Sequence, residues 1–559
     1  MNLPTEEIRK RALAEGASSQ LELNKIKLQV ARERSLKKVP TNIELMSSTN
    51  QSSTELFSIK PTRISSGVNV VAIMTKPIAC PHGKCTYCPG GPGSVFGDVP
   101  QSYTGNEPAT MRAIRNRFDA YLQVMSRLEQ YGAMNKLKGK IELIIMGGTF
   151  PSFDDSYQDE FVSNALQAMN DFSSIFYKDK TLDRPAFNEF FELPGDIRDP
   201  LRTGRIQEKL LALKTRRSIE STQLENETSQ IRCIAMCIET KPDWCMQPHI
   251  DKMLSLGTTR VELGIQTLSD SILKNTNRGH TLQDSFISTQ LLKDSFLKVG
   301  YHMMPGQPGS TPEMDKKMLL ELFENPDYRP DALKIYPCLV MPGTPLYEQW
   351  KNGNFKPIES DEVARIIAEV KPSIPVYCRI MRIQRDIPTK VTAAGADRTN
   401  LRQLVSEKVK SAGSRCRCIR CREPRWNEVD FESVKLTRID YDSSGGKEIF
   451  LSFDDTKNDF LLGYLRLRIP SKPFREEITP GSAGIRELHV FGKSAAIGDE
   501  GMIQHKGFGS SLVKEAERIA KEEFDCKKML VISGIGAREY YRRKLGYERE
   551  GAYMWKKLN

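Results

Sequence analysis

Three cysteines lie close together in the segment CPHGKCTYCPGG. Cys80, Cys85 and Cys88 directly follow the apolar run VNVVAIM, which predicts a loop at the carboxyl end of a strand. Three thiolates on one loop can bind three irons of a 4Fe-4S cluster and leave the fourth iron open to a small molecule. A zinc knuckle with His82 as the fourth ligand is the alternative. The position at the end of a strand favours the cluster.

Four more polar or glycine-rich motifs also follow apolar runs. They are MGGTF at Met146–Phe150, ETKPD at Glu239–Asp243, GIQT at Gly264–Thr267 and HMMPGQPG at His302–Gly309. Each motif alone is compatible with an ordinary turn. Because the carboxyl ends of parallel strands meet at one edge of a sheet, five such motifs in succession predict a binding site there. We call this edge the mouth of the barrel.

A second cysteine group lies in CRCIRCRE, where Cys416, Cys418 and Cys421 alternate with arginines. Close-set cysteines indicate structural zinc, which needs a fourth ligand from elsewhere in the chain. We expect Cys338 as that ligand because it ends an expected strand near the domain junction, with Cys378 as second choice. Either thiol can instead be buried and inert.

The segment around this group is strongly basic. Residues 371–425 contain 14 Lys or Arg against 4 Asp or Glu, and the whole chain has a net charge of +11. Such a density predicts binding to a polyanion, although a solvated basic face is the alternative.

The motif QHKGFG, with Gln504, Gly507 and Gly509, stands before an expected helix. Glycines there let the backbone approach a pyrophosphate, and a helix amino terminus offers free N–H groups. The order of RELHVFG, this turn, VISG and REYYRRKLGY is similar to that of acetyl-coenzyme A-binding acetyltransferases of the GNAT type. By that similarity Tyr541 would meet the thioester, with Tyr540 as its neighbour. Helix packing is the alternative for both tyrosines.

The elements that position these motifs predict an α/β protein. From Val68 onward short apolar runs alternate with amphipathic stretches in about six units, which indicates a parallel sheet closed into a partial (β/α) barrel. We expect a basic, mobile amino-terminal arm and linker at 1–65, the barrel at 66–370, a basic zinc-binding junction at 371–425 and a smaller α/β domain at 426–559. A polar, mostly helical insertion lies between Tyr177 and Gln230.

Composition limits the classes of protein. The chain has 559 residues with 39% hydrophobic and 27% charged side chains, which excludes a disordered or fibrous protein and a single small module. No run of about 18 apolar residues and no signal peptide is evident, so we expect no membrane association and a cytoplasmic location. Twelve cysteines in such a chain favour metal or redox chemistry over disulfides.

Taken together, the motifs closely resemble the family of Elongator catalytic subunits. The resemblance runs from about Val68 to the carboxyl end and is carried by CPHGKCTYCPGGPGS, QSYTGNEPATMRAIRNRFD, MGGTF, ETKPD, YHMMPGQPGSTPEMD, RIQRDIP, NLRQ, CRCIRCRE, RELHVFG, QHKGFG and SGIGAREYYRRKLGYE. It implies a radical SAM partial barrel joined to a GNAT-type acetyltransferase domain. The implied cofactors are a 4Fe-4S cluster, S-adenosylmethionine, acetyl-coenzyme A and zinc.

The resemblance also implies residue roles. Cys80, Cys85 and Cys88 would bind the cluster, and Tyr541 with Tyr540 would be catalytic. Contacts to acetyl-coenzyme A would come from Lys140, Glu487, Leu488, His489, Val490, Phe508, Gly509, Ser510 and Tyr541. Two departures from the family pattern are Lys241, where the family often has Arg, and Gln307, which interrupts the usual GLPG. Lys keeps the charge but loses the planar fork that holds a carboxylate.

The implied activity is formation of a carboxymethyl group at C5 of the wobble uridine of tRNA. A 5′-deoxyadenosyl radical would take hydrogen from the acetyl methyl, the carbon radical would add to the uridine, and the thioester would be hydrolysed. We expect the thioester to point toward the mouth of the barrel. The basic segment would hold the anticodon arm, and accessory Elongator-like subunits or a homodimer are possible partners. Two rivals are a protein-lysine acetyltransferase with a structural Fe-S domain and a zinc-stabilised RNA-binding protein.

Overall fold

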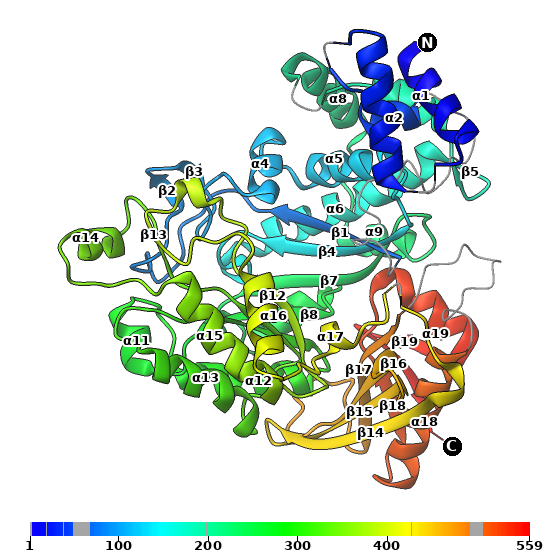
Figure 1. Cartoon of the computed structure of the whole chain (residues 1–559). Coiled ribbons are helices and arrows are strands. Elements are labelled where there is room, and N and C mark those ends of the chain that lie inside the picture. The colour runs from blue at the N-terminus through cyan, green and yellow to red at the C-terminus, as the bar shows by residue number, and fades with distance from the viewer. Residues whose placement is uncertain are drawn as a thin grey trace.

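The computed structural model describes residues 3–17, 19–36, 38–47, 67–196, 199–425, 427–491 and 507–558. Two seven-stranded sheets organise the described chain, which confirms the predicted α/β class. Figure 1 shows the barrel strands side by side, with the orange and red C-terminal domain at the end opposite to α14 and β2. None of the described helices is long and apolar enough to span a bilayer.

The first sheet is wholly parallel and has the strand order β1-β4-β7-β8-β9-β10-β12. Its strands are β1 (Val68–Met74), β4 (Lys140–Met146), β7 (Arg232–Thr240), β8 (Arg260–Gln266), β9 (Lys298–Met303), β10 (Ala332–Ile335) and β12 (Arg379–Ile383). Six strands match the expected units. The seventh, β12, lies in the segment expected to be a junction, so the sheet continues past residue 370.

The sheet is curved into a partial barrel. The Nζ of Lys334 on β10 lies 2.9 Å from Oε1 of Glu239 on β7, although β8 and β9 separate the two strands. On β1 and β4 alternate residues such as Val71 and Leu143 are buried beneath the helices, while the residues between them face the concave side. An alternation with a period of two residues is typical of a β-strand whose two faces differ in burial.

Helices cover the outer side of this sheet. The long helix α6 (Asp155–Phe176) packs on α5 (Ala120–Ala133), whose first turn is capped by the Asp119 carboxylate accepting from the backbone N–H of Leu122. The other barrel helices are α4 (Pro108–Arg115), α10 (Gln247–Ser255), α11 (Asp270–Asn275), α12 (Leu282–Asp294), α13 (Pro312–Glu324), α14 (Pro345–Lys351) and α15 (Ser360–Val370). The insertion is mostly helical, as predicted, with α7 (Arg184–Phe190), α8 (Pro200–Leu213) and α9 (Ile219–Asn226).

The amino-terminal segment is folded where the structure describes it. Helices α1 (Leu3–Ala14), α2 (Gln20–Glu33) and α3 (Asn42–Ser47) share a small core that includes Ile8, Leu23 and Val30. The segment expected as a basic arm is therefore helical and has a small core of its own, because its apolar residues bury one another. The expected linker at 48–66 lies outside the described residues.

The second sheet has the order β14-β15-β16-β17-β18-β20-β19 and is mostly antiparallel. Its strands are β14 (Val434–Ser443), β15 (Gly446–Asp455), β16 (Phe460–Ile469), β17 (Ser482–Val490), β18 (Lys528–Val531), β20 (Tyr553–Lys557) and β19 (Glu548–Glu550), with helices α18 (Phe508–Glu522) and α19 (Arg538–Leu545). Strands β17 and β18 are parallel and pair only as far as Ile485 and Val531. Beyond that pair they form an open fork.

The C-terminal domain packs on the amino ends of the barrel strands. Arg486 of β17 contacts Asp331, which directly precedes β10, at 2.6 Å, and both side chains are fully buried. Arg468 of β16 contacts Asp294 at 2.6 Å at the end of α12, again with no exposure. Hydrogen-bonded pairs of this kind compensate the cost of burying charge. The two domains are thus held together by a buried ionic network.

Candidate functional site

The first cysteine loop lies at the mouth of the barrel, as predicted. Cys85 and Cys88 are buried and Cys80 is half-buried. The Cys80 sulfur lies 3.5 Å from Oγ1 of Thr149, and the Cys88 sulfur accepts the backbone N–H of Ser102 at 3.2 Å. Burial raises the pKa of Cys88 to about 11 when no metal is bound. A bound metal would hold these thiolates deprotonated.

The spacing of the sulfurs separates the two alternatives for this loop. Four thiolates on one tetrahedral zinc lie about 3.8 Å apart, because each Zn–S bond is about 2.3 Å. Within the described residues, the sulfurs of Cys80, Cys85 and Cys88 are not all within 4.8 Å of one another, whereas the second cysteine group meets this limit. Wider spacing suits thiolates that bind different irons of a cluster. The loop therefore fits a 4Fe-4S cluster better than a single zinc.

The glycine motif after β4 turns close to this loop. Gly147 and Gly148 have positive φ values of 121° and 84°. A Cβ on Gly147 would lie 2.3 Å from Oγ1 of Thr75, and one on Gly148 would lie 3.9 Å from the Cys80 sulfur. Only glycine combines this backbone conformation with this close approach. The turn leaves open backbone beside the cluster loop, where a small ligand can bind.

Cationic side chains surround the same loop. Lys241 is buried and lies 3.1 Å from Asp243, while Arg278 lies 3.8 Å from the Cys85 sulfur and donates to the Gly264 carbonyl. Burial lowers the pKa of Lys241, although Asp243 opposes that shift. Two cations beside three thiolates balance the negative charge that a cluster would bring.

Several buried polar atoms at the mouth have no hydrogen-bond partner in the described chain. They are His82 Nδ1, Thr86 Oγ1, Tyr87 OH, Asp243 Oδ1, Gln266 Oε1, Arg278 Nε, both ring nitrogens of His280 and Gln307 Oε1. Unpaired buried polar groups are costly and rare, so such a concentration indicates a ligand site. The residues present thus fit a cluster with a polar organic ligand beside it.

Sequence reasoning missed two residues of this site. Arg278 and His280 lie in NRGHT, between α11 and α12, which was not singled out. Gly279 brings that turn against the loop, since a Cβ there would lie 2.5 Å from Cβ of His82. The signal available was the cationic Arg-Gly-His triplet that follows the GIQT motif by about ten residues.

Inside the barrel lies a second polar group, formed by Glu239, Glu262, His302 and Lys334. The His302 Nε2 is 2.8 Å from Glu262, and Lys334 contacts both carboxylates. The two carboxylates and the imidazole could in principle bind a metal ion. The ammonium of Lys334 already fills the cationic position, so this group is a closed ion-pair network.

The second cysteine group forms a compact site. The sulfurs of Cys416, Cys418 and Cys421 lie within 4.8 Å of one another, which suits one zinc ion. The structure does not bring Cys338 to this group, because Cys338 packs with Cys85 and Cys88 at the mouth of the barrel. Cys378 lies beside it instead, since its carbonyl accepts the Ile419 N–H at 3.0 Å. Cys378 therefore replaces Cys338 as the expected fourth ligand.

The basic segment is partly neutralised by the C-terminal domain. Arg417 contacts Asp459 at 2.8 Å, Arg422 contacts Asp454 at 2.8 Å, and Arg415 also pairs with Asp459. Arg420 is half-buried and donates to the Met381 carbonyl. The arginines of CRCIRCRE thus make contacts at the junction between the barrel and the C-terminal domain.

Exposed cations remain in the same segment. Lys390, Arg398 and Lys410 are exposed, and the described chain gives no ion pair for them.

The acetyl-coenzyme A residues predicted on β17 and α18 come together. A Cβ on Gly509 would lie 3.7 Å from Cγ2 of Val490 and 3.9 Å from Cδ2 of Leu488. Glu487–Val490 form the open side of the fork, because β18 pairs only with earlier residues of β17. Helix α18 begins after Gly507 and presents the N–H groups of Phe508–Ser510. Gln504 lies outside the described residues.

The two tyrosines of α19 differ in environment. The Tyr540 hydroxyl lies 3.5 Å from Oγ of Ser510 and beside Gly509, with 37% of the residue exposed. Tyr541 is buried in the core against Tyr547, and burial raises its pKa well above the usual range. The structure thus directs Tyr540, rather than Tyr541, toward the cradle formed by Leu488, Val490 and Gly509.

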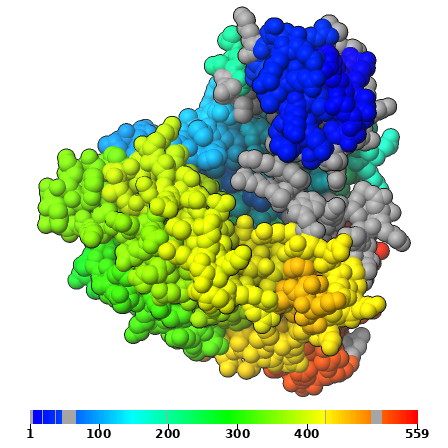
Figure 2. Space-filling model, in the orientation of Figure 1, coloured from blue at the N-terminus to red at the C-terminus, as the bar shows by residue number. Residues whose placement is uncertain are grey.

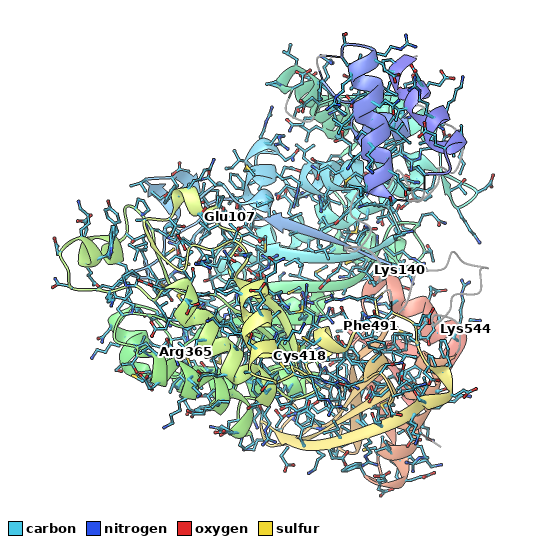
Figure 3. The ribbon with its side chains drawn as sticks, viewed as in Figure 1. Glu107, Lys140, Arg365, Cys418, Phe491 and Lys544 are labelled. Atoms are coloured by element: carbon cyan, nitrogen blue, oxygen red, sulfur yellow. The ribbon has the colours of Figure 1, made fainter. Side chains whose placement is uncertain are left out.

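The fork opens at the amino end of the barrel. Gly534, just beyond β18, contacts the Ile234 backbone of β7, and Glu487 pairs with Lys298, the first residue of β9. Lys140 begins β4 at the same end, and Figure 3 shows it on the side where the C-terminal domain meets the barrel. The C-terminal domain therefore docks at the end opposite to the mouth, so a thioester directed to the mouth would have to reach along the barrel.

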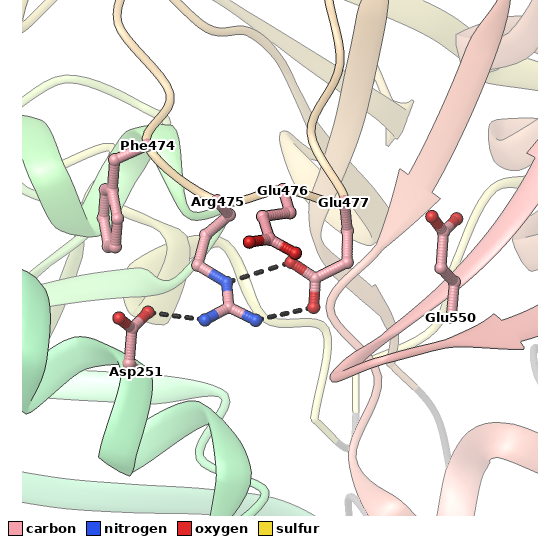
Figure 4. Close-up of a pocket in the computed structure, with 6 residues that line it drawn as sticks. All are labelled: Asp251, Phe474, Arg475, Glu476, Glu477 and Glu550. Atoms are coloured by element: carbon pink, nitrogen blue, oxygen red, sulfur yellow. Dashed lines mark hydrogen bonds and ion pairs between the residues drawn. The ribbon is translucent and has the colours of Figure 1, made fainter.

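A cavity of about 670 Å³ lies between α10 and the loop after β16. Figure 4 shows Arg475 held between Asp251 and Glu477, with Phe474, Glu476 and Glu550 also lining the cavity. No predicted site residue lines it. It lies apart from the cysteine loop and the fork.

Comparison with known families assigns both halves of the chain. The Radical SAM superfamily matches residues 77–322, a Radical_SAM C-terminal domain matches residues 330–411, and the acetyltransferase (GNAT) family matches residues 418–547. The fold and the two sites therefore define a radical SAM protein with a GNAT domain, as predicted. The Radical SAM assignment implies a 4Fe-4S cluster and S-adenosylmethionine, and the GNAT assignment implies acetyl-coenzyme A.

Full-length relatives narrow this class. A tRNA uridine(34) acetyltransferase of Methanocaldococcus infernus is 51% identical over 89% of this chain and 87% of the relative. The Elongator complex protein 3 of Homo sapiens is 39% identical over 96% of this chain and 93% of the relative. A solved archaeal structure from M. infernus, lacking residues 1–46, has 46% identity and a TM-score of 0.71, and covers 88% of this chain and all of that one. The chain belongs to the Elongator complex protein 3 family.

Proposed function

We propose that this protein modifies the wobble uridine of tRNA, using S-adenosylmethionine and acetyl-coenzyme A to form a carboxymethyl group at C5. The observation that carries the proposal is that fully buried pairs, Arg486 with Asp331 and Arg468 with Asp294, hold the domains of the two candidate ligand sites together. The curated relative from M. infernus is named a tRNA uridine(34) acetyltransferase, which supports the same substrate.

The mouth of the barrel would hold the cluster and its organic ligand. Cys80, Cys85 and Cys88 would bind three irons, and Lys241 would meet the carboxylate of S-adenosylmethionine. When bound, the cluster and S-adenosylmethionine supply one-electron chemistry that can remove hydrogen from an unreactive methyl group. The unpaired ring nitrogens of His280 would face the same ligand.

The fork and the first turn of α18 would hold acetyl-coenzyme A. The N–H groups of Phe508–Ser510 suit the pyrophosphate, and the unpaired edge of Glu487–Val490 suits the amides of the pantetheine arm. Tyr540 would donate its hydroxyl proton to the departing thiolate. Lys140 would contact the same cofactor from the barrel.

Among the described residues, the carboxylate at the open side of the fork is unsuited to act as the base of a lysine acetyltransferase. Burial alone would raise the pKa of Glu487, but Lys298 and Arg466 hold it well below its usual range. The carboxylate also accepts hydrogen bonds from the Tyr464 hydroxyl at 2.7 Å and from Nε of Arg466 at 2.9 Å. A group so stabilised as an anion cannot take a proton from a lysine ammonium near neutral pH. This argues against that rival.

The tRNA would bind to exposed cations of the basic segment. Lys390, Arg398 and Lys410 are exposed and suit phosphate contacts. Replacing each by Ala should weaken tRNA binding and lower the salt slope by about one for each lost contact. Arg415→Ala is the matched control, because Arg415 already pairs with Asp459. An equal loss in the control would assign the effect to net charge.

The second cysteine group would bind a structural zinc ion through Cys416, Cys418, Cys421 and Cys378. It would tie β12 of the barrel to the segment that enters the C-terminal domain. Because metal binding is coupled to folding, this site would stabilise the junction.

The direct test is nucleoside analysis. Protein reconstituted anaerobically with iron and sulfide is incubated with a reductant, S-adenosylmethionine, acetyl-coenzyme A and unmodified tRNA, and the digested tRNA is analysed by mass spectrometry. We expect 5-carboxymethyluridine only when every component is present, and none with Cys85→Ser. Acetyl-lysine formed on peptides without S-adenosylmethionine, in place of modified tRNA, would reject the proposal.

A further inference from the structure

The two ligand sites lie at opposite ends of the barrel, although one reaction needs both. Cys80 follows β1 at the mouth, whereas Glu487 meets Lys298 at the amino end. The seven residues of β4 span about 20 Å at 3.3 Å per residue. The acetyl group therefore needs a route along the barrel.

The concave face of β1 and β4 offers that route. Val70 on β1, the edge strand of the sheet, is 40% exposed on the concave side. Ala72, Glu142 and Ile144 are also partly exposed. In the register of the two strands, Val70 lies opposite Glu142 and Ala72 lies opposite Ile144. Met146 continues the partly exposed line toward Gly148 and Cys80.

The rest of the concave face is charged rather than apolar. The network of Glu239, Glu262, His302 and Lys334 fills the side formed by β7 to β10. Figure 2 shows the surface hollowed between the blue N-terminal helices and the yellow segments, with blue and teal atoms of the barrel at its base. The apolar strip on β1 and β4 thus lies beside a charged group on β7 to β10.

We propose that this strip, formed by Val70, Ala72, Ile144 and Met146, is a passage that takes the acetyl-bearing end of acetyl-coenzyme A from the fork to the mouth. The proposal rests on the proposed function, because it assumes that both cofactors serve one reaction. The middle of the strip is apolar, which suits an uncharged thioester and methyl group and does not suit a phosphodiester backbone. At its amino end the strip continues into Lys140, a residue expected to contact the same cofactor.

The first experiment measures protection of introduced cysteines. Val70→Cys and Ala72→Cys are alkylated with a maleimide, and the modified peptides are quantified by mass spectrometry with and without ethyl-coenzyme A, an analogue that cannot be hydrolysed. We expect alkylation at least five-fold slower with the analogue. Leu201→Cys, on the outer surface of α8 and 75% exposed, is the control and should not change.

Two results of this experiment would overturn the proposal. One is an unchanged rate at Ala72→Cys when calorimetry shows that the analogue is bound. The other is protection by an anticodon stem-loop RNA and not by the analogue, which would assign the strip to a nucleotide. Because no radical step is needed, the outcome is independent of whether tRNA is modified.

The second experiment blocks the strip. Ala72→Trp should keep the iron content and the absorbance of the cluster but lower carboxymethyluridine formation at least ten-fold, whereas Ala72→Ser should keep both. Full product formation by Ala72→Trp would show that the acetyl group takes another route and would overturn the proposal.

Discussion

At the scale of single residues, the spacing of chemical groups along the chain was predictable from the sequence, whereas their surroundings in the fold were not. Cys80, Cys85 and Cys88 were predictable because three ligands on one loop need no tertiary information. The fourth ligand of the second cysteine group was not, since only the packing of β12 separates Cys378 from Cys338. The same limit applies to Tyr540 and Tyr541. Neighbours on a helix point about 100° apart, so the sequence cannot tell which one faces the cradle.

The two tyrosines give the first prediction. Tyr540→Phe should lower the rate of acetyl-coenzyme A hydrolysis with tRNA present by about 100-fold, the usual contribution of a general acid. Tyr541→Phe keeps the buried ring and should retain most of the rate. Rates are followed by release of free thiol, with tRNA binding measured as the control. A larger loss in Tyr541→Phe than in Tyr540→Phe would restore the original assignment.

The zinc site gives the second prediction. Cys378→Ser should lower zinc content and thermal stability, because the metal loses one of four ligands. Cys338→Ser is the matched control and should keep its zinc, since this thiol packs at the mouth of the barrel. Elemental analysis of both purified variants decides the point. Loss of zinc in Cys338→Ser alone would return the ligand to Cys338.

At the scale of elements, the alternation of strands and helices predicted the barrel and the smaller sheet, whereas the docking of the two was not predictable. Arg486, Asp331 and Arg466 are far apart in sequence, and each reads as an ordinary charged residue until the fold buries it. The amino-terminal helices were interpreted as an arm because their polar residues outnumber the few, such as Ile8, that form their core. The strand β12 was not predicted, because its apolar residues Ile380 and Ile383 lie among the arginines of a basic segment.

The buried network gives the third prediction. Arg486→Leu should destabilise the protein by about 3 kcal/mol, because it removes the main partner of the buried Asp331. Denaturant unfolding measures the loss. Arg518→Leu, an exposed arginine of α18, is the control and should change little, because its ion pairs are solvated. Equal stability of the two variants would mean that the network does not hold the domains together.

At the scale of the whole molecule, one chain holds two ligand sites at opposite ends of a barrel. The cysteine loop lies in the part that matches the Radical SAM superfamily and the fork in the part that matches the GNAT family, and neither match alone explains why the other is present. The presence of both sites in one chain is explained if the acetyl group of acetyl-coenzyme A reaches the mouth of the barrel. The joint reaction followed from the family resemblance, but nothing in the sequence showed at which end of the barrel the second domain docks.

Deuterium transfer tests this joint reaction most directly. Acetyl-coenzyme A with a trideuterated methyl group is incubated anaerobically with the reconstituted protein, S-adenosylmethionine, a reductant and unmodified tRNA, and the 5′-deoxyadenosine released is analysed by mass spectrometry. We expect one deuterium in the 5′-deoxyadenosine, dependent on tRNA, together with carboxymethyluridine that keeps two. Carboxymethyluridine formed alongside 5′-deoxyadenosine without deuterium would contradict this expectation.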